Sequence, residues 1–182
     1  SAASDVYKRQ VYYNYTQDGA LWDKYSRRED PTAATTLVPT GSTWKYLDTG
    51  VDQGTAWRFS SFDDSTWASG PAELGYGDAP ATTVSFGADA NNKYVTTYFR
   101  KTFTVSSPSQ YGRLRMRIKR DDGCIVYLNG AEVYRVNMAP TGTIAFSTLA
   151  DTTVGGTDEE TFFTTPDIQN LLTSGNNLLA VE

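Results

Sequence analysis

Two pairs of adjacent acidic residues are the part of this sequence that could most readily do chemistry. Asp63-Asp64 and Asp121-Asp122 each place two carboxyl groups side by side. Hydrolysis of a glycosidic bond uses two carboxyl groups about 5–10 Å apart, one of them as a proton donor. Each pair, however, lies in a turn-like sequence, where Asp side chains accept hydrogen bonds from backbone N–H groups. We therefore interpret both pairs as structural.

The absence of histidine narrows the chemistry further. The chain of 182 residues contains no His and a single Cys, Cys124, which falls in an apolar run and is expected to be a buried, inert thiol. Histidine is the usual general base for Ser and Cys nucleophiles and the commonest ligand of transition metals. Asp158-Glu159-Glu160 could contribute oxygen ligands to a structural calcium ion, but no spaced calcium-binding motif accompanies them. We predict no cofactor and no enzymatic activity.

Aromatic side chains could instead offer flat apolar faces to a sugar ring, although in a β-domain such rings more often fill the core. The candidates are Trp57, Trp67, Tyr76 and Tyr98. Tyr76 lies among glycines in the 70–80 segment and is the best suited to an exposed loop. The same segment contains Asp78, a hydrogen-bond acceptor. Asp121 and Asp122 would add acceptors if the fold brings their turn to the same end, so these four residues form the predicted ligand-binding site.

The net charge argues against nucleic acid as a partner, and the lack of a long apolar stretch argues against insertion into a membrane. Sixteen basic and 21 acidic residues give a formal net charge of −5, which provides no general attraction for nucleic acid. No apolar stretch approaches the roughly 20 residues needed to cross a bilayer, so membrane insertion is not expected. The row Arg113, Arg115, Arg117 and Lys119 could bind an anionic polymer. We interpret it as the solvated or domain-facing side of an amphipathic strand.

The elements that must position these residues are predicted to be short β-strands. Residues 113–120 alternate strictly, with Leu114, Met116 and Ile118 on one side, and these three are predicted to face the core. Asn129-Gly130 is typical of a tight hairpin turn. Further strands are expected at 43–47, 94–105, 124–128, 131–136, around 162–163 and from 176 to the end. A single helical turn is expected at 166–172. The fold class is all-β, a two-sheet antiparallel sandwich.

The chain divides into three parts. Residues 1–10 match the translated end of a sequencing-library adapter, and we interpret them as an artefact. Residues 11–41 are polar and mixed, and are expected to be a linker or the tail of a preceding segment. Residues 42–182 carry the strand pattern and stop inside a strand, which suggests a C-terminally truncated piece of a longer chain.

Four sequence blocks are distinctive in their order and spacing: FDDSTW with the glycine-rich stretch after it (62–78), TYFRKTF (97–103), DDGCIVYLNGAEV (121–133) and GNNLLAVE (175–182). Together they resemble the galactose-binding-domain-like jelly rolls. Such domains precede the barrel of β-galactosidase-like glycosidases and accompany other bacterial secreted proteins. The resemblance implies a jelly-roll sandwich and a non-catalytic accessory module that is extracellular or at the cell surface. We expect it to bind a glycan. The alternative is a purely architectural domain that packs against a neighbouring domain of the parent chain.

Overall fold

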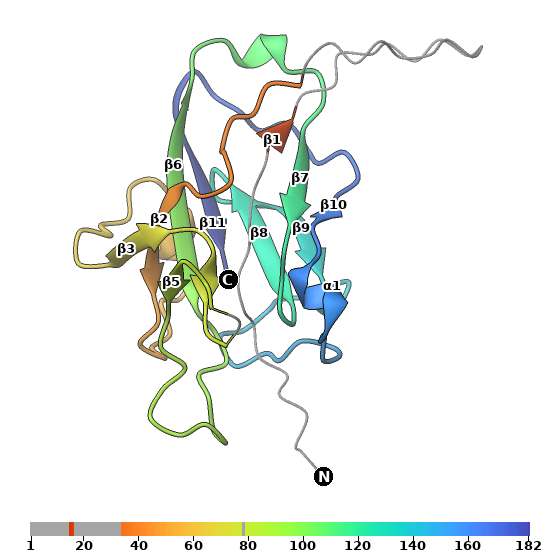
Figure 1. Cartoon of the computed structure of the whole chain (residues 1–182). Coiled ribbons are helices and arrows are strands. Elements are labelled where there is room, and N and C mark those ends of the chain that lie inside the picture. The colour runs from red at the N-terminus through yellow and green to blue at the C-terminus, as the bar shows by residue number, and fades with distance from the viewer. Residues whose placement is uncertain (1–14, 17–33, 78) are drawn as a thin grey trace.

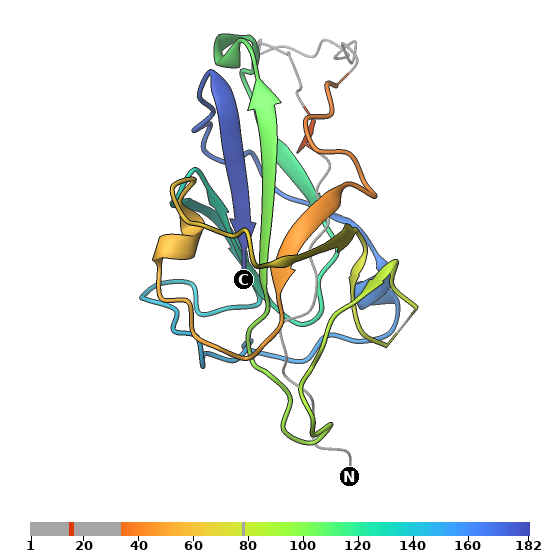
Figure 2. The same cartoon turned by 90° about the vertical axis from the view of Figure 1, so that its left-hand side faces the viewer.

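A six-stranded antiparallel sheet forms the centre of the molecule, with strand order β3-β2-β6-β11-β8-β9 (Figures 1 and 2). The computed structural model describes residues 15–16, 34–77 and 79–182. The six strands are β2 (Thr43–Leu47), β3 (Ala68–Pro71), β6 (Tyr98–Val105), β8 (Cys124–Leu128), β9 (Ala131–Val136) and β11 (Gly175–Val181). Residues 1–10, interpreted above as an artefact, lie outside the described residues.

The remaining elements are short. A three-stranded sheet has β7 (Arg115–Ile118) between β1 (Tyr15–Thr16) and β10 (Phe163–Thr164). A small parallel pair joins β4 (Leu74–Gly75) to β5 (Thr82–Thr83). One α-helix, α1 (Thr157–Glu160), and two 3-10 turns, η1 (Ala56–Arg58) and η2 (Pro108–Gln110), complete the described part of the chain. The nearly all-β class is therefore confirmed, whereas the finer jelly-roll assignment stays a prediction.

One face of the central sheet, called the front face here, packs against β7. Alternate residues of β6, β8 and β11 form an apolar cluster on this face, the front cluster, with Leu114, Met116 and Ile118, which are at most 1% exposed. Burial of these three side chains confirms the prediction from strict alternation, since a one-residue shift would turn them all to the solvent.

The back face of the same sheet is buried as well. The intervening residues of these strands form a second apolar cluster, the back cluster, with Trp57 and Trp67. Its strand residues include Tyr98, Tyr127 and Leu178. The loops 48–67 and 137–150 supply its outer layer. Both faces are covered, and accordingly β8 and residues 178–181 of β11 are continuous apolar runs rather than alternating ones.

The hairpin between β8 and β9 is tipped by Asn129 and Gly130, as the sequence predicts. Both residues have positive φ, 52° and 91° respectively, the backbone conformation that a tight hairpin turn requires. The Asn129 side chain also reaches β11, because its Oδ1 accepts a hydrogen bond from the backbone N–H of Leu178 at 2.9 Å.

Two expectations need correction. The helical turn predicted at 166–172 is wrong: Ile168 forms an isolated antiparallel bridge with Leu114, and the α-helix lies at Thr157–Glu160 instead. Ile168 is 8% exposed and packs in the front cluster, a contact that local sequence does not report. The folded part also begins before residue 42, because Val38 is fully buried and β1 pairs with β7. Part of the span expected to be a linker therefore belongs to the domain.

Replacing Gly130 should destabilise the domain measurably. A Cβ there would lie 2.3 Å from a ring carbon of Phe59, and a positive φ costs a non-glycine residue about 1–2 kcal/mol. We expect Gly130→Ala to lower the free energy of unfolding in urea by about that amount. Gly112→Ala, where nothing lies within 4 Å of the added Cβ, is the control and should be nearly neutral. Equal stability of both variants would contradict the predicted strain.

Candidate functional site

Tyr76, the aromatic residue of the predicted ligand site, follows β4 and is only half-buried. Its ring packs against the front cluster, and its centroid lies 5.0 Å from that of Phe86. The ammonium nitrogen of Lys93 lies 5.3 Å from the centroid of the Tyr76 ring. Tyr76 thus offers part of a ring beside a cation. Asp78, its predicted partner, lies outside the described residues.

The other two predicted ligand residues are buried. Asp121 is 8% exposed and Asp122 is 1% exposed. One carboxylate oxygen of Asp122 accepts a hydrogen bond from the backbone N–H of Val154 at 2.5 Å, and its carbonyl accepts one from Asn137 at 3.2 Å. These bonds fasten the 137–154 segment to the connection between β7 and β8. Both carboxyl groups are therefore interior groups rather than surface acceptors.

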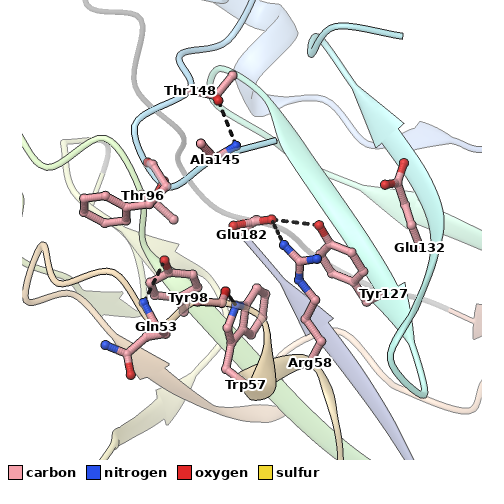
Figure 3. Close-up of polar contacts among 12 residues, drawn as sticks. Gln53, Trp57, Arg58, Thr96, Tyr98, Tyr127, Glu132, Ala145, Thr148 and Glu182 are labelled. Carbon is pink, nitrogen blue, oxygen red and sulfur yellow. Dashed lines mark hydrogen bonds and ion pairs between the residues drawn. The ribbon is translucent and has the colours of Figure 1, made fainter. Parts of the chain in front are cut away.

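A polar network on the back face was not predicted from the sequence. Glu182, directly after β11, is buried, and its Oε1 accepts hydrogen bonds from Arg58 at 3.0 Å and from the Tyr127 hydroxyl at 2.7 Å (Figure 3). The guanidinium carbon of Arg58 also lies 4.1 Å from the centroid of the Tyr127 ring. The carboxylate is thus paired with a cation and hydrogen-bonded on the same oxygen. These interactions offset the free energy that is lost when the charge is removed from water.

Aromatic rings enclose this network. The ring of Trp57 contacts those of Tyr98 and Tyr127, with centroids 4.8 Å and 5.7 Å away. Trp57 Nε1–H donates to the carbonyl of Gly54 at 3.1 Å, and the Gln53 N–H donates to the Tyr98 hydroxyl at 3.3 Å (Figure 3). Trp57, Tyr98 and Tyr127 are at most 3% exposed. No face of these three rings is open to a sugar.

Burial and the Glu182 carboxylate together resist ionisation of the two tyrosines. Burial raises the pKa of Tyr98 to about 12, and the nearby negative charges of Glu182 and Asp52 act in the same direction. Burial, together with the charge and the hydrogen bond of Glu182, also raises the pKa of Tyr127. Both hydroxyls are neutral hydrogen-bonding groups near neutral pH, not bases.

A second ion cluster fixes the acidic pair of the 62–67 block. Asp63 accepts a hydrogen bond from the Ser65 N–H at 2.9 Å, the turn role expected from sequence. Asp64 binds Arg100 Nε at 2.7 Å and Lys45 Nζ at 2.8 Å. Burial alone would raise the pKa of Asp64, but the hydrogen bonds from Lys45 and Arg100 outweigh it and hold this pKa below its usual value.

Arg100 is the most deeply buried cation among these contacts, at 4% exposure. Besides Asp64, its guanidinium group donates to the carbonyl of Trp57 and, at 3.1 Å, to that of Phe59. Lys45 and Arg100 are directly opposite each other on β2 and β6, so both cations project from neighbouring strands onto the back face. The Arg100 side chain therefore binds the 57–64 segment, which covers the back face, through three groups: two carbonyls and one carboxylate.

The sequence contained one signal for this arrangement. Alternation along β6 places Tyr98 and Arg100 on the same face, and Tyr98 belongs to the apolar cluster. A charge in such a register requires a buried partner. The distant residues that supply that partner could not be identified from the strand itself.

The basic row on β7 is largely occupied. Arg113 and Arg115 both contact Asp167, at 3.5 Å and 2.6 Å, and Lys119 contacts Glu73 at 2.9 Å. These pairs tie β7 to the 165–168 segment and to the loop before β4. The row is thus mainly an intramolecular ion-pair surface.

Two further features were sought in the described residues, a group of metal-ligating side chains and a membrane-spanning helix. No group of three or more His, Cys, Asp or Glu side chains there is arranged to hold a metal ion. Within the same residues, no helix has both the length and the apolar character needed to cross a bilayer.

Comparison with known proteins gives partial structural similarity only. Neither a protein-family model nor a curated protein sequence matches the chain. A solved β-glycosidase from Bacteroides vulgatus aligns with 78% of this chain and 16% of its own, at 21% identity and a TM-score of 0.46. A β-glucuronidase from an uncultured Clostridium sp. aligns with 78% of this chain and 20% of its own, at 17% identity and a TM-score of 0.44. The chain thus spans at most about a fifth of either enzyme.

Alkaline pH should expose the role of the buried tyrosines. Because the pKa of Tyr98 is raised to about 12 in the folded state, its stabilising effect is complete below the unfolded pKa near 10 and is lost as pH rises toward 12. Stability should fall over this window by up to about 1.4 kcal/mol per pH unit for this one group. Urea unfolding of the wild type and Tyr98→Phe at pH 9 to 11 checks this. The variant should show a shallower decline; parallel curves would contradict the assignment.

Proposed function

We propose that this chain is a non-catalytic accessory domain that works by packing within a larger extracellular bacterial protein. Its sandwich-like body would act as a rigid unit beside a neighbouring domain. The proposal includes the jelly-roll assignment that the sequence blocks suggest.

One observation carries this proposal: the groups best suited to chemistry or to sugar binding are used inside the domain. Asp64, Asp122 and Glu182 each accept hydrogen bonds from the domain itself. Trp44, Trp57 and Trp67 are at most 7% exposed. A carboxylate held by an internal cation is poorly placed to transfer protons to a substrate, because its charge already stabilises the fold.

The parent protein is inferred from the resemblance of the sequence blocks. Domains of this kind stand beside the catalytic barrel of β-galactosidase-like glycosidases, and a carbohydrate-active parent outside the cell fits that resemblance. A fold alone does not define a function, so the parent's identity rests on the quoted blocks.

Carbohydrate binding by the domain itself is the second candidate. The partly exposed Tyr76 ring next to Lys93 favours it, because an aromatic face and a donor are typical of a shallow sugar site. The glycines around Tyr76 would let backbone approach a ligand. If this site binds neutral glycans, Tyr76→Ala should abolish binding in a titration while the fold is unchanged.

The non-catalytic assignment predicts that the purified chain releases no phenolate from a panel of aryl glycosides above the buffer rate. The measurement is absorbance over hours at a high protein concentration. Turnover that is lost in Asp122→Asn or Asp64→Asn, with an unchanged melting temperature, would contradict the proposal. Turnover that survives both substitutions would contradict it as well, unless it disappears on further purification and so belongs to a contaminant.

A further inference from the structure

Two arginines at the end of β7 stack on two consecutive phenylalanines of the adjacent segment. The guanidinium carbon of Arg117 lies 4.6 Å from the centroid of the Phe162 ring, and that of Arg120 lies 5.1 Å from the centroid of Phe163. Pairing of β7 with β10 brings the two segments together, with Phe163 opposite Ile118 (Figure 1). Stacking on a ring face orients a guanidinium group while leaving its edge available for hydrogen bonds.

These two arginines differ from the others in the described residues. Arg58, Arg100, Arg113, Arg115 and Arg135 all form ion pairs with carboxylates. Arg117 and Arg120 form none within the described part of the chain. Two nitrogens of Arg120, Nε and Nη1, are also buried with no hydrogen-bond partner. A charged donor removed from water without a partner is costly, so an acceptor that reached the Arg120 guanidinium group would stabilise it.

Arg117 and Phe163 are the exposed members of this group. Arg117 is exposed, and Phe163 is 39% exposed, one of few large apolar side chains that reach the surface. The acidic helix α1 lies just before Phe162 in sequence. Its Glu159 is bonded to the Gly156 N–H, and its exposed Asp158 and Glu160 form no ion pair with either arginine in the described structure.

We propose that Arg117 and Arg120, with the rings of Phe162 and Phe163, form a binding site for an acidic polysaccharide. The guanidinium groups would bind carboxylate or sulfate groups of successive sugars, since arginine presents donors in a geometry that fits such oxyanions. The exposed part of the Phe163 ring would contact the C–H face of a pyranose. The site is separate from Tyr76 and does not rest on the proposed packing role.

The overall charge of the chain makes this proposal specific. With a formal net charge of −5, the protein as a whole repels a polyanion. Any binding must therefore come from a local site and not from general attraction. It should also weaken as salt is added, because exposed charges are screened over about 10 Å at 0.1 M ionic strength.

The test is a calorimetric titration of the chain with polygalacturonate at low salt. Neutral dextran and polyglutamate serve as comparison polymers. The variants are Arg117→Gln, Arg120→Gln and the double substitution. Arg135→Gln is the matched control, because it removes the same charge from an arginine that is paired with Glu132. Circular dichroism and melting temperature verify the fold of each variant, and the exposed Arg117 keeps the test informative if Arg120→Gln is unstable.

We expect polygalacturonate to bind and dextran not to bind at this site. The double substitution should weaken binding at least about tenfold, because charge-assisted hydrogen bonds are lost, and Arg135→Gln should change it less than about twofold. Absence of binding by the wild type would overturn the proposal. An equal loss in Arg135→Gln would overturn it in favour of net charge, and equal binding of polyglutamate would overturn it in favour of an acidic protein partner. None of these results alters the absence of turnover expected for the proposed function.

Discussion

The hydrogen bonds and the ion pair made by the guanidinium group of Arg100 are the interactions on which the covering of the back face depends. A loop that crosses a sheet face carries backbone carbonyls that cannot pair with the strands beneath, and burying them without partners would be costly. Arg100 projects from β6 into that layer and donates to the carbonyls of Trp57 and Phe59 and to the carboxylate of Asp64. Its own charge is thereby satisfied at 4% exposure. The loop and the cation each make the burial of the other tolerable.

The covering of both sheet faces follows from this. With the 48–67 loop held in place, Trp57 and Trp67 can fill the back cluster, and the aromatic side chains of β6 and β8 meet them instead of water. Glu182 and Arg58 repeat the arrangement at the end of β11. Aromatic and charged residues, which in an exposed setting would suggest a ligand site, here hold layers of the domain together. Among the described residues, Tyr76 and Arg117 are two side chains that these internal contacts leave partly or largely exposed.

Local sequence patterns predicted most of the strands and the hairpin correctly. The prediction of a helical turn at 166–172 was wrong because the conformation there depends on a distant contact. Strict alternation was sufficient to place Met116 in the core, and Asn129-Gly130 to place the hairpin, because both signals lie within a few residues. The extended conformation at Ile168 depends on Leu114, more than fifty residues earlier, and local propensity favoured a helical turn instead.

The burial of the acidic residues in the predicted site also depends on distant contacts. An Asp in a turn-like sequence looks exposed, yet Asp122 is buried because the distant Val154 N–H reaches it. The partners of Arg100 and Glu182 are likewise separated from them by 36 or more positions in sequence. Alternation shows that a charge faces inward, but only the tertiary fold shows which group receives it. Tyr76 remains a predicted sugar contact.

Hydrogen exchange in Arg100→Met tests the central claim most directly. The amides of Phe62 and Trp67 are hydrogen-bonded within the covering loop, whereas those of Val126 and Ala180 belong to central strands. If Arg100 holds the loop, its removal should lower protection of the two loop amides at least about tenfold more than that of the two strand amides, because the loop opens as a local unit. Equal changes at all four amides, or no change at Phe62 and Trp67, would contradict the account.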